Sequence, residues 1–494
     1  MKWVRFYCEY MFSRIETYLC GTLQGSLISH CFSNGSFQLH LFLMYKISVF
    51  LMLYCIVIEK HVCVTFYQLF IVTEKSTLVI GHAEVARVVL KKGKTQLFRS
   101  GNPMVYSGAI DRVVGRPPPV AGDLVMVTDG AEQPIAWGVY NPLSMFAVRI
   151  MQTEDEARRE PECVLNMETL LQSRIESAVK LRKLLGLPST NHTNVFRLVN
   201  SEGDRLSGLI VDVLGEHVVV ASSAAWVERH RATIEVAIGQ AIKTSQMSWR
   251  PSVEILKEEG LQVDISKDSS LEPALDVVDD FEVVENGVRY LASLAGQKTG
   301  FYADQRDSRL LLRSITGGST VLDLCCYSGG FALNAALGGA SHTIGVDSSA
   351  PALELAKANA SLNQIDANSI NFVKADVGEY MKSALSEGKL WDIVVLDPPK
   401  LAPNRKVLQR ATTRYRNLNS MAMRLIKPGG LLMTCSCSGA MTQSGNFLSV
   451  IQEAALSANR RVTQLRYAGA APDHTIDPAY PEGTYLTNVL LRVQ

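Results

Sequence analysis

Apolar runs alternate with helical patterns in the C-terminal part of the chain, and this alternation constrains the fold more than any other feature. In order, the runs are "TVLDLCC", "HTIGVD", "INFVKAD", "WDIVVLD" and "GGLLMTCS". Helical patterns such as "APALELAKANASLNQ" lie between the early runs. Strands that alternate with helices form a parallel sheet covered on both faces, so we expect a doubly wound α/β domain. Two later runs, "RVTQLRY" and "YLTNVLLRV", have no helical pattern between them and predict an antiparallel edge on that sheet.

The chain before this domain divides into further segments. Residues 84–152 show short apolar alternation, as in "DLVMVTD" and "FAVRIM", which predicts a small β-barrel. Residues 160–275 combine a helical pattern, "METLLQSRIESAVKLRKLLGL", with several strand patterns and predict a compact α+β module. The predicted fold class is therefore α/β, with a Rossmann-like domain over residues 280–494 that follows the barrel and the module.

Residues 1–80 differ in composition from the rest, being rich in Phe, Tyr, Leu, Cys and Met and poor in acids. The clean apolar run from Val49 to Ile58 is shorter than the roughly 20 residues that a membrane-spanning helix needs. A signal peptide is disfavoured because the run starts late and no small-residue cleavage site follows it. A weak anchor, an organelle-targeting extension and a segment outside the working protein remain. We favour the last two, so membrane association is not expected.

The overall charge excludes a globally basic nucleic-acid binder. The formal net charge is +1 and the isoelectric point is near 7.6. Any nucleic-acid binding must therefore come from local patches. One candidate patch lies at the start of the barrel segment and consists of Lys91, Lys92, Lys94 and Arg99. A solvated basic edge is the alternative interpretation.

The cysteines favour a reducing compartment and no metal. Half of the ten lie in the first 63 residues, and no C-x-x-C pair is present. A structural zinc site would need four nitrogen or sulfur ligands at suitable spacing. Cys435 and Cys437 have no second pair nearby, and His474 is a lone candidate. We therefore predict no metal site.

Acidic residues at successive strand ends predict a cofactor site. Asp323, Asp347 and Asp376 belong to the first three runs, where open α/β sheets bind ligands. The first run turns through "YSGG" into a helix, whose N-terminus offers N–H groups to a carboxylate. Asp347 suits a ribose diol, and Asp376 suits an adenine amino group. An Asp at a strand end is often a helix cap, so the prediction depends on the ordered set of acids and not on any one of them.

The glycine pattern selects among adenosyl cofactors. The loop contains neither G-x-G-x-x-G nor G-x-x-x-x-G-K-[ST], so dinucleotides and P-loop nucleotides are disfavoured. S-adenosylmethionine (SAM), which has an amino-acid tail and no phosphate, fits best. The predicted SAM-binding residues in the strand-end loops are Asp323, Tyr327, Ser328, Gly329, Asp347 and Asp376.

The fourth and fifth runs predict the acceptor site. "LDPPK" places Asp397 at a strand end, but Lys400 stands where an aromatic residue would suit methylation of an exocyclic amine. "TCSCS" brings Cys435 and Cys437 to the same edge. A thiolate that adds to carbon-6 of cytosine makes carbon-5 nucleophilic, and Asp397 would stabilise the change at N3. Lys400 and Arg306 are candidates for lowering the thiol pKa. Apolar packing explains the two cysteines equally well.

With these residues assembled, the chain from about residue 86 onward resembles the bacterial RlmI-type ribosomal RNA large-subunit 5-methylcytosine methyltransferases. These are SAM-dependent enzymes with an N-terminal PUA domain. The matching motifs are "NPMVYSGAI", "FRLVNSEGDRLSGLIVD", "QKTGFYADQRDSR", "YSGGFAL", "LDPPK", "CSGAMT" and "YPEGTYL". The order and spacing of the last four make the resemblance specific. Residues 1–75 match nothing in the family.

The resemblance implies roles that spacing alone left open. Gln305 and Arg306 would help to form the SAM pocket. Cys437 matches the family cysteine and would be the nucleophile, whereas the position of Cys435 is usually not cysteine. Lys400 occupies the place where many other RNA 5-methylcytosine enzymes carry a second cysteine that helps product release. Where the family has His-Pro-Trp in the PUA part, this chain has Asn-Pro-Met, so a base-stacking aromatic there would be lost.

The leading hypothesis is a SAM-dependent methyltransferase that forms 5-methylcytosine in large-subunit ribosomal RNA by covalent Cys437 catalysis, with Asp397 and Lys400 assisting. The PUA part, through Lys91, Lys92, Lys94 and Arg99, and the middle module would hold the surrounding RNA by phosphate contacts. The alternatives are methylation of an exocyclic guanine amine and a non-catalytic RNA-binding assembly factor. The resemblance permits a homodimer. The expected compartment is the cytoplasm, or a plastid or mitochondrion if the organism is eukaryotic.

Overall fold

The computed structural model of the chain describes residues 85–189, 192–262, 281–292 and 301–494. The expectations for residues 1–80 lie outside these described residues. Within them, no helix is both long enough and apolar enough to cross a membrane.

The first part is a six-stranded sheet with short helical turns. Its elements are β1 (Arg87–Leu90), α3 (Thr95–Arg99), β2 (Met104–Val105), β3 (Ile110–Val114), β4 (Leu124–Thr128), β5 (Pro134–Tyr140) and β6 (Val148–Thr153). The strand order is β2-β6-β5-β4-β1-β3, and only the β1–β4 pairing is parallel. Alternating side chains such as Val125 and Val127 pack into its core with Phe98.

The Asn-Pro-Met stretch lies inside this part. Met104 is 2% exposed, and its backbone N–H donates a hydrogen bond to the side-chain oxygen of Asn102 at 3.1 Å. The side chain at position 104 therefore packs in the interior of this chain and is not available to stack on a base.

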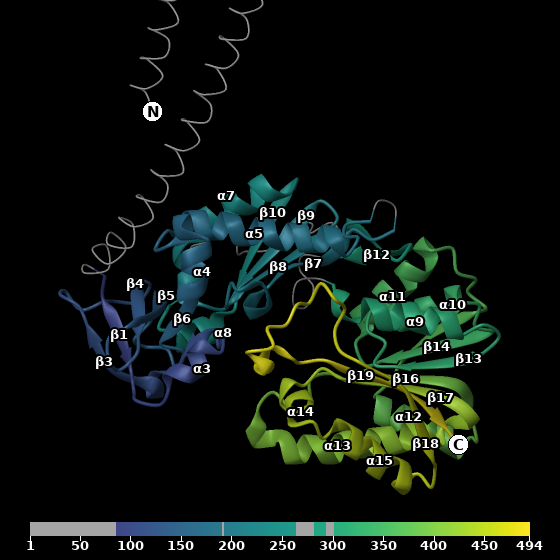
Figure 1. The fold of residues 1–494 in the computed structure, drawn as a ribbon. Coiled ribbons are helices and arrows are strands. Elements are labelled where there is room, and N and C mark those ends of the chain that lie inside the picture. The colour runs from purple at the N-terminus through teal and green to yellow at the C-terminus, as the bar shows by residue number, and fades with distance from the viewer. Residues whose placement is uncertain (1–84, 190–191, 263–280, 293–300) are drawn as a thin grey trace, which may run out of the picture. The chain divides into compact units, whose positions relative to one another are not determined.

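The middle part is a four-stranded sheet with helices. Its elements are α4 (Glu154–Arg159), α5 (Met167–Leu184), β7 (Val195–Asn200), β8 (Leu209–Leu214), β9 (His217–Ser222), α6 (Ala225–Arg229), α7 (Arg231–Ala241), β10 (Gln246–Pro251) and α8 (Val253–Glu258). The strand order is β10-β9-β8-β7. Asn166 caps α5 by accepting from the Thr169 N–H. Helices α5 and α7 lie together beside the sheet (Figure 1), and their apolar faces share one core with it.

A hairpin and a doubly wound domain complete the chain. The hairpin pairs β11 (Phe281–Glu285) with β12 (Val288–Ala292). The domain contains α9 (Arg306–Ile315), β13 (Thr320–Leu324), α10 (Gly330–Leu337), β14 (His342–Asp347), α11 (Ala350–Leu362), β15 (Ile370–Lys374), α12 (Val377–Ser386), β16 (Trp391–Leu396), α13 (Leu408–Arg424), β17 (Ile426–Ser436), α14 (Gly439–Ser444), α15 (Phe447–Ser457), β18 (Val462–Ala468) and β19 (Thr487–Val493).

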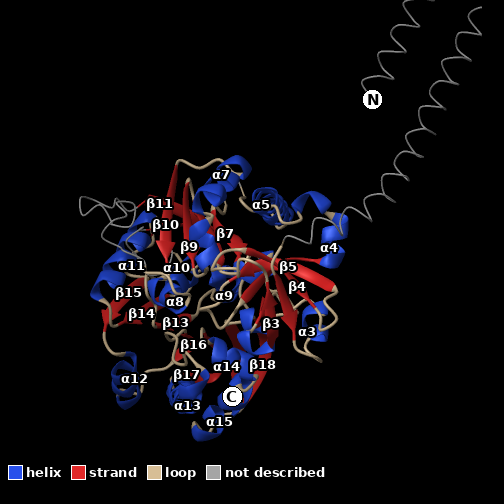
Figure 2. Ribbon diagram, turned by 90° about the vertical axis from the view of Figure 1, so that its left-hand side faces the viewer, coloured by secondary structure: helices blue, strands red, loops and turns tan. Residues whose placement is uncertain are grey.

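The sheet order β15-β14-β13-β16-β17-β19-β18 confirms the doubly wound prediction. Strands β13 to β17 pair in parallel, whereas β19 pairs antiparallel with both β17 and β18. Helices α9, α10 and α11 lie on one side of the sheet, and α12, α13 and α15 on the other (Figures 1 and 2). The chain order reverses between β13 and β16. Ligands bind at such a switch point, outside the carboxyl ends of the strands.

Candidate active site

The loop after β13 is tightly wound. Cys325, Tyr327 and Gly329 adopt left-handed backbone angles, with φ of 65°, 49° and 85°. A Cβ atom on Gly329 would also lie 3.2 Å from the side chain of Ala356, so glycine suits both the backbone angle and the packing. The carbonyl of Ser328 accepts a hydrogen bond from Asn359 at 3.1 Å. This winding turns the chain directly into α10.

Asp347, at the end of β14, holds this loop in place. One carboxylate oxygen accepts from the Tyr327 N–H at 3.0 Å, and the other accepts from the Ser349 N–H at 2.9 Å. The side chain is half-buried. Asp347 therefore lies at the sheet edge beside the predicted cofactor loop, as the sequence predicted.

Asp323 is fully buried in β13. One oxygen accepts from the Ala332 N–H at 2.9 Å, which fixes the start of α10. The other oxygen has no hydrogen-bond partner among the described residues. Burial, opposed by the Ala332 hydrogen bond and reinforced by the charges of Asp397 and Asp347, raises the pKa of Asp323 to about 8. An unpartnered buried carboxyl oxygen at a switch point fits a ligand that donates a hydrogen bond or carries positive charge.

Asp376 is exposed and caps α12. Its side chain accepts from the Glu379 N–H at 3.1 Å. One oxygen of this carboxylate is therefore a helix cap, which was the alternative interpretation of the acid. The residue lies two positions after the end of β15, at the same edge of the sheet as Asp347.

The fourth and fifth parallel strands bring a thiol and a carboxylate together. β17 ends at Ser436, so Cys437 begins the loop that leads to α14. Its Sγ lies 3.5 Å from an oxygen of Asp397, which follows β16. The other oxygen of Asp397 accepts from Gln305 at 3.4 Å. Gln305 is 3% exposed, and its own Oε1 has no partner among the described residues. The Oε1 atom of Gln305 is therefore a second buried polar atom without a partner among the described residues, after the Asp323 oxygen, and it belongs to a side chain that contacts Asp397.

The two neighbouring cysteines have different environments. Cys435 is fully buried, and its Sγ accepts from the Asn488 side chain at 3.1 Å. Burial, together with the charges of Asp397 and Cys437, raises its pKa well above the ordinary value. Cys437 is half-buried at the sheet edge. A buried thiol with a raised pKa is a poor nucleophile, so the geometry favours Cys437 for covalent chemistry.

Residues on α13 and its preceding loop hold the segment around Cys437. The Tyr415 hydroxyl lies 2.9 Å from the Ser438 hydroxyl and accepts from the Ser436 hydroxyl at 3.2 Å. Ser438 also accepts from the Ala402 N–H at 3.0 Å. Both residues that flank the thiol are therefore fixed by one tyrosine. Sequence reasoning missed Tyr415, because nothing in its local pattern distinguishes it from a core residue.

Arg306 lies in a different setting from the one expected. Its guanidinium binds both oxygens of Asp473, at 3.1 and 2.7 Å, and the side chain is buried. This cation is thus committed to an ion pair, so the structure does not support the expectation that Arg306 lowers the thiol pKa. Lys400 is exposed on the loop after Asp397.

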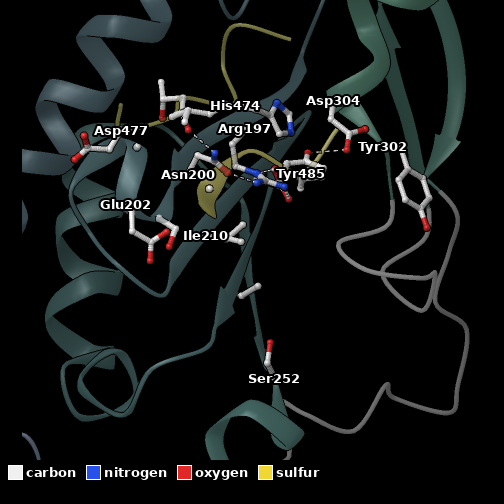
Figure 3. Close-up of a pocket in the computed structure, with 18 of the residues that line it drawn as sticks. Arg197, Asn200, Glu202, Ile210, Ser252, Tyr302, Asp304, His474, Asp477 and Tyr485 are labelled. Atoms are coloured by element: carbon white, nitrogen blue, oxygen red, sulfur yellow. Dashed lines mark hydrogen bonds and ion pairs between the residues drawn. The ribbon is translucent and has the colours of Figure 1, made fainter. Parts of the chain in front are cut away.

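A cavity of about 660 Å³ lies between the middle part and the doubly wound domain (Figure 3). Arg197 and Asn200 line it from β7, while Tyr302, Asp304 and Tyr485 line it from the other side. The Tyr485 hydroxyl donates to Asp304 at 2.7 Å.

Tyr302 links this cavity to the loop after β13. Its ring packs edge-on against that of Tyr327, with ring centroids 5.3 Å apart. The cavity therefore adjoins the predicted cofactor loop. Its size suits a nucleotide-sized group.

The basic patch predicted in the first part is partly engaged. The Lys91 ammonium donates to the Gly108 carbonyl at 2.9 Å, and Arg99 pairs with Asp129 at 3.3 Å. Lys92 and Lys94 are exposed. In the described ranges, no group of three or more His, Cys, Asp or Glu side chains is arranged to hold a metal ion.

Comparisons with known proteins agree with this geometry. The family model described as S-adenosylmethionine-dependent methyltransferase matches residues 249–482, and one described as a PUA-like domain matches residues 88–153. The "Ribosomal RNA large subunit methyltransferase I" of Photobacterium profundum is 34% identical over 81% of this chain and 97% of that protein. The protein of the same name from Escherichia coli strain SMS-3-5 is 32% identical over 82% of this chain and 99% of that protein.

Solved structures share the fold. A Streptococcus mutans protein, provisionally described as a SAM-dependent methyltransferase, is 20% identical and superposes with a TM-score of 0.66. The similarity covers 82% of this chain and 99% of that one. A second structure, with a TM-score of 0.65, contains bound SAH.

Proposed function

Because this chain belongs to the ribosomal RNA large subunit methyltransferase I family, we propose that it transfers a methyl group from SAM to carbon-5 of a cytosine in large-subunit ribosomal RNA. The resemblance drawn from the motifs is confirmed at the level of the family. The observation that carries the carbon-5 assignment is the half-buried Cys437 thiol, 3.5 Å from Asp397 at the switch-point edge of the sheet.

The residues of the site fit SAM, which supplies an electrophilic methyl group on a positively charged sulfur when bound. The unpartnered oxygens of Asp323 and Gln305 provide buried acceptors for a polar, cationic ligand. Asp347 and Asp376 would hold the ribose hydroxyls and the adenine amino group. The backbone of Tyr327, Ser328 and Gly329 would enclose the amino-acid tail. In this proposal Arg306 does not contact SAM. It supports the SAM pocket indirectly, through its ion pair with Asp473.

The chemistry of the acceptor follows from the other two strand ends. The Cys437 thiol would pass its proton to Asp397, to which it already donates, and the thiolate would add to carbon-6 of the cytosine. Carbon-5 would then take the methyl group from SAM, with S-adenosylhomocysteine as the leaving group, while the protonated Asp397 stabilises the negative charge that develops at N3. A base then removes the carbon-5 proton, and elimination of the thiolate restores the ring and the free enzyme. The exposed Lys400 remains the candidate cation that favours the thiolate.

The target cytosine must be unstacked, because a thiol cannot reach carbon-6 inside a helix. The cavity between Arg197 and Tyr302 would provide space for the displaced nucleotide or its neighbour (Figure 3). The basic residues Lys92 and Lys94 of the PUA-like part would add phosphate contacts away from the chemistry.

The direct test is methyl transfer from labelled SAM to large-subunit ribosomal RNA stripped of protein, read by bisulfite sequencing. We expect one cytosine to become protected from deamination. A methylated base that leaves every cytosine bisulfite-sensitive would favour methylation of an exocyclic amine. Failure to bind SAM at all would favour a non-catalytic RNA-binding role.

The raised pKa of Asp323 makes a further prediction for SAM binding. The free enzyme holds this carboxyl protonated below about pH 8, whereas a cationic ligand beside it would favour the carboxylate. Binding should therefore release a proton, and the affinity should rise with pH up to about 8 and then level off. Each pH unit in that range would raise it by at most about tenfold.

Calorimetry in two buffers of different ionisation enthalpy measures the proton release. The Asp323→Asn variant is the reference, since it keeps the titration of the ligand's own amino group and removes that of the enzyme. Equal proton release by wild type and variant would show that Asp323 does not sense the ligand's charge.

The bacterial origin of the relatives supports the cytoplasm as the proposed compartment. Light scattering of the purified protein, with and without RNA, tests the homodimer that the family resemblance permits.

A further inference from the structure

A long segment beside the nucleophile carries charge of only one sign. Between Asp397 and Glu453 the sequence contains no acidic residue. The basic residues in this interval are Lys400, Arg405, Lys406, Arg410, Arg414, Arg416, Arg424 and Lys427. The chain as a whole is nearly neutral, so this interval is a strong local concentration of positive charge.

Arg405, Lys406, Arg410 and Arg414 form what we name the α13 strip. All of them are exposed, and the last three recur every four residues, so they share one side of the helical stretch. From Lys406 to Arg414 the strip extends on the order of 10 Å.

Within the described part of the chain, no side chain of the strip forms an ion pair, because no carboxylate oxygen lies within 4 Å of its nitrogen atoms. Other bases of the same interval are paired, as Lys427 is with Asp392 and Arg416 with Glu453. The strip therefore keeps its full charge for a partner outside the chain.

The position of the strip on its helix is electrostatically unfavourable for the free protein. Arg405 and Lys406 immediately precede α13, Arg410 lies in its first turn, and that turn contains no acid. The N-terminal end of a helix dipole favours anions and disfavours cations. An anion bound here would interact with the basic side chains and with the helix terminus together.

The strip is held at a fixed position relative to the thiol. Tyr415, on the same helix, hydrogen-bonds to the residues on either side of Cys437, and the loop before the strip is joined to Ser438 through Ala402. Helix α13 also packs against α15 through Tyr415 and Phe447. It lies beside α14 and α15 in both views (Figures 1 and 2). The hydrogen bonds that hold the residues around Cys437 therefore also hold the strip, so an anion bound to the strip has a fixed position relative to the thiol.

We propose that the α13 strip binds consecutive phosphates of the RNA strand that contains the target cytosine. This inference rests on the proposed function, and it assigns the main phosphate contacts to the doubly wound domain. The patch in the PUA-like part contributes less, because Lys91 and Arg99 are already engaged within the chain. A strand held at the strip would lie on the helix whose Tyr415 holds the residues on either side of Cys437.

The test removes the strip charges and measures RNA binding as a function of salt. The variant carries Arg405→Gln, Lys406→Gln, Arg410→Gln and Arg414→Gln in the full chain, because glutamine keeps helix propensity. The matched control carries Arg158→Gln, Lys180→Gln, Lys357→Gln and Lys389→Gln, which remove the same charge from exposed residues that each have a carboxylate partner.

For the strip variant we expect affinity for large-subunit RNA to fall about 10- to 100-fold at roughly 0.15 M salt. The slope of log affinity against log salt should become shallower by about 0.7 for each lost contact to single-stranded RNA. SAM affinity and the single-turnover rate at saturating RNA should match wild type. The control should bind RNA as wild type does.

An unchanged slope in the strip variant would overturn the proposal, as would an equal loss in the control. The binding assay needs no turnover, so it separates this inference from the proposed function. If wild type binds RNA through the strip but methylates no cytosine, the function fails and the docking surface stands. If wild type methylates and the strip variant binds normally, the docking surface fails alone.

Discussion

Replacing Cys437 with serine is expected to lower the methylation rate by about a thousandfold or more, because a serine hydroxyl does not provide a nucleophile comparable to a thiolate at neutral pH. Affinity for SAM should stay within about twofold, since the proposed SAM contacts lie on other strand ends. Single-turnover methyl transfer from labelled SAM measures the first quantity, and calorimetry measures the second.

The chain supplies its own control for this experiment in Cys435. Its thiol is fully buried, and its pKa is raised by burial, so Cys435→Ala should retain most of the activity once the protein is folded. Full activity in Cys437→Ser would rule out covalent catalysis by this residue. Loss of activity in both variants, with normal folding, would assign the chemistry to the pair instead of to one thiol.

Removing the carboxylate of Asp473 is expected to lower the free energy of unfolding by about 3–5 kcal/mol, because a buried cation then loses its partner. Asp473 is fully buried and binds the Arg306 guanidinium through both oxygens, while the Arg197 N–H donates to it at 2.8 Å. Burial alone would raise the pKa of Asp473, but His474 and Arg306 hold it well below its ordinary range. Chemical denaturation of Asp473→Ala against wild type measures the loss.

Asp477→Ala provides a matched comparison from the same loop. That half-buried carboxylate accepts from the nearby Ala479 N–H at 2.8 Å, so its removal should cost less than about 1 kcal/mol. The double variant Asp473→Ala with Arg306→Met should recover part of the stability, because it leaves no unpaired charge. Equal stability of Asp473→Ala and wild type would mean that the buried ion pair does not contribute measurably to the free energy of unfolding.

The doubly wound sheet with its antiparallel edge and the acids at the strand ends could be predicted because their signals are local. Apolar runs that alternate with helical patterns identify β13 to β17. The absence of a helical pattern between the last two runs indicates the antiparallel edge formed by β18 and β19. Asp347, Asp376 and Asp397 lie at or within two residues of the ends of their strands, so parallel pairing brings them to one edge without further information.

Long-range partners could not be predicted in this way. Arg306 was expected near the cofactor and thiol, but its guanidinium binds Asp473, 167 residues later in the chain. Tyr415 fixes both neighbours of Cys437, although its local pattern is that of any buried helix residue. A Cβ atom on Gly203 would clash with the carbonyl oxygen of Thr475, a close approach that no local motif announces.

The sequence by itself determined the class of the domain, the family, and the set of residues from which the chemistry is drawn. These follow from periodicity and motif spacing, which are properties of neighbouring residues. Only the tertiary structure decided which thiol is buried, which carboxyl has a raised pKa, and which basic side chains remain unpaired. Burial and charge pairing depend on segments that are distant along the chain and meet only when the sheet and the middle part pack together.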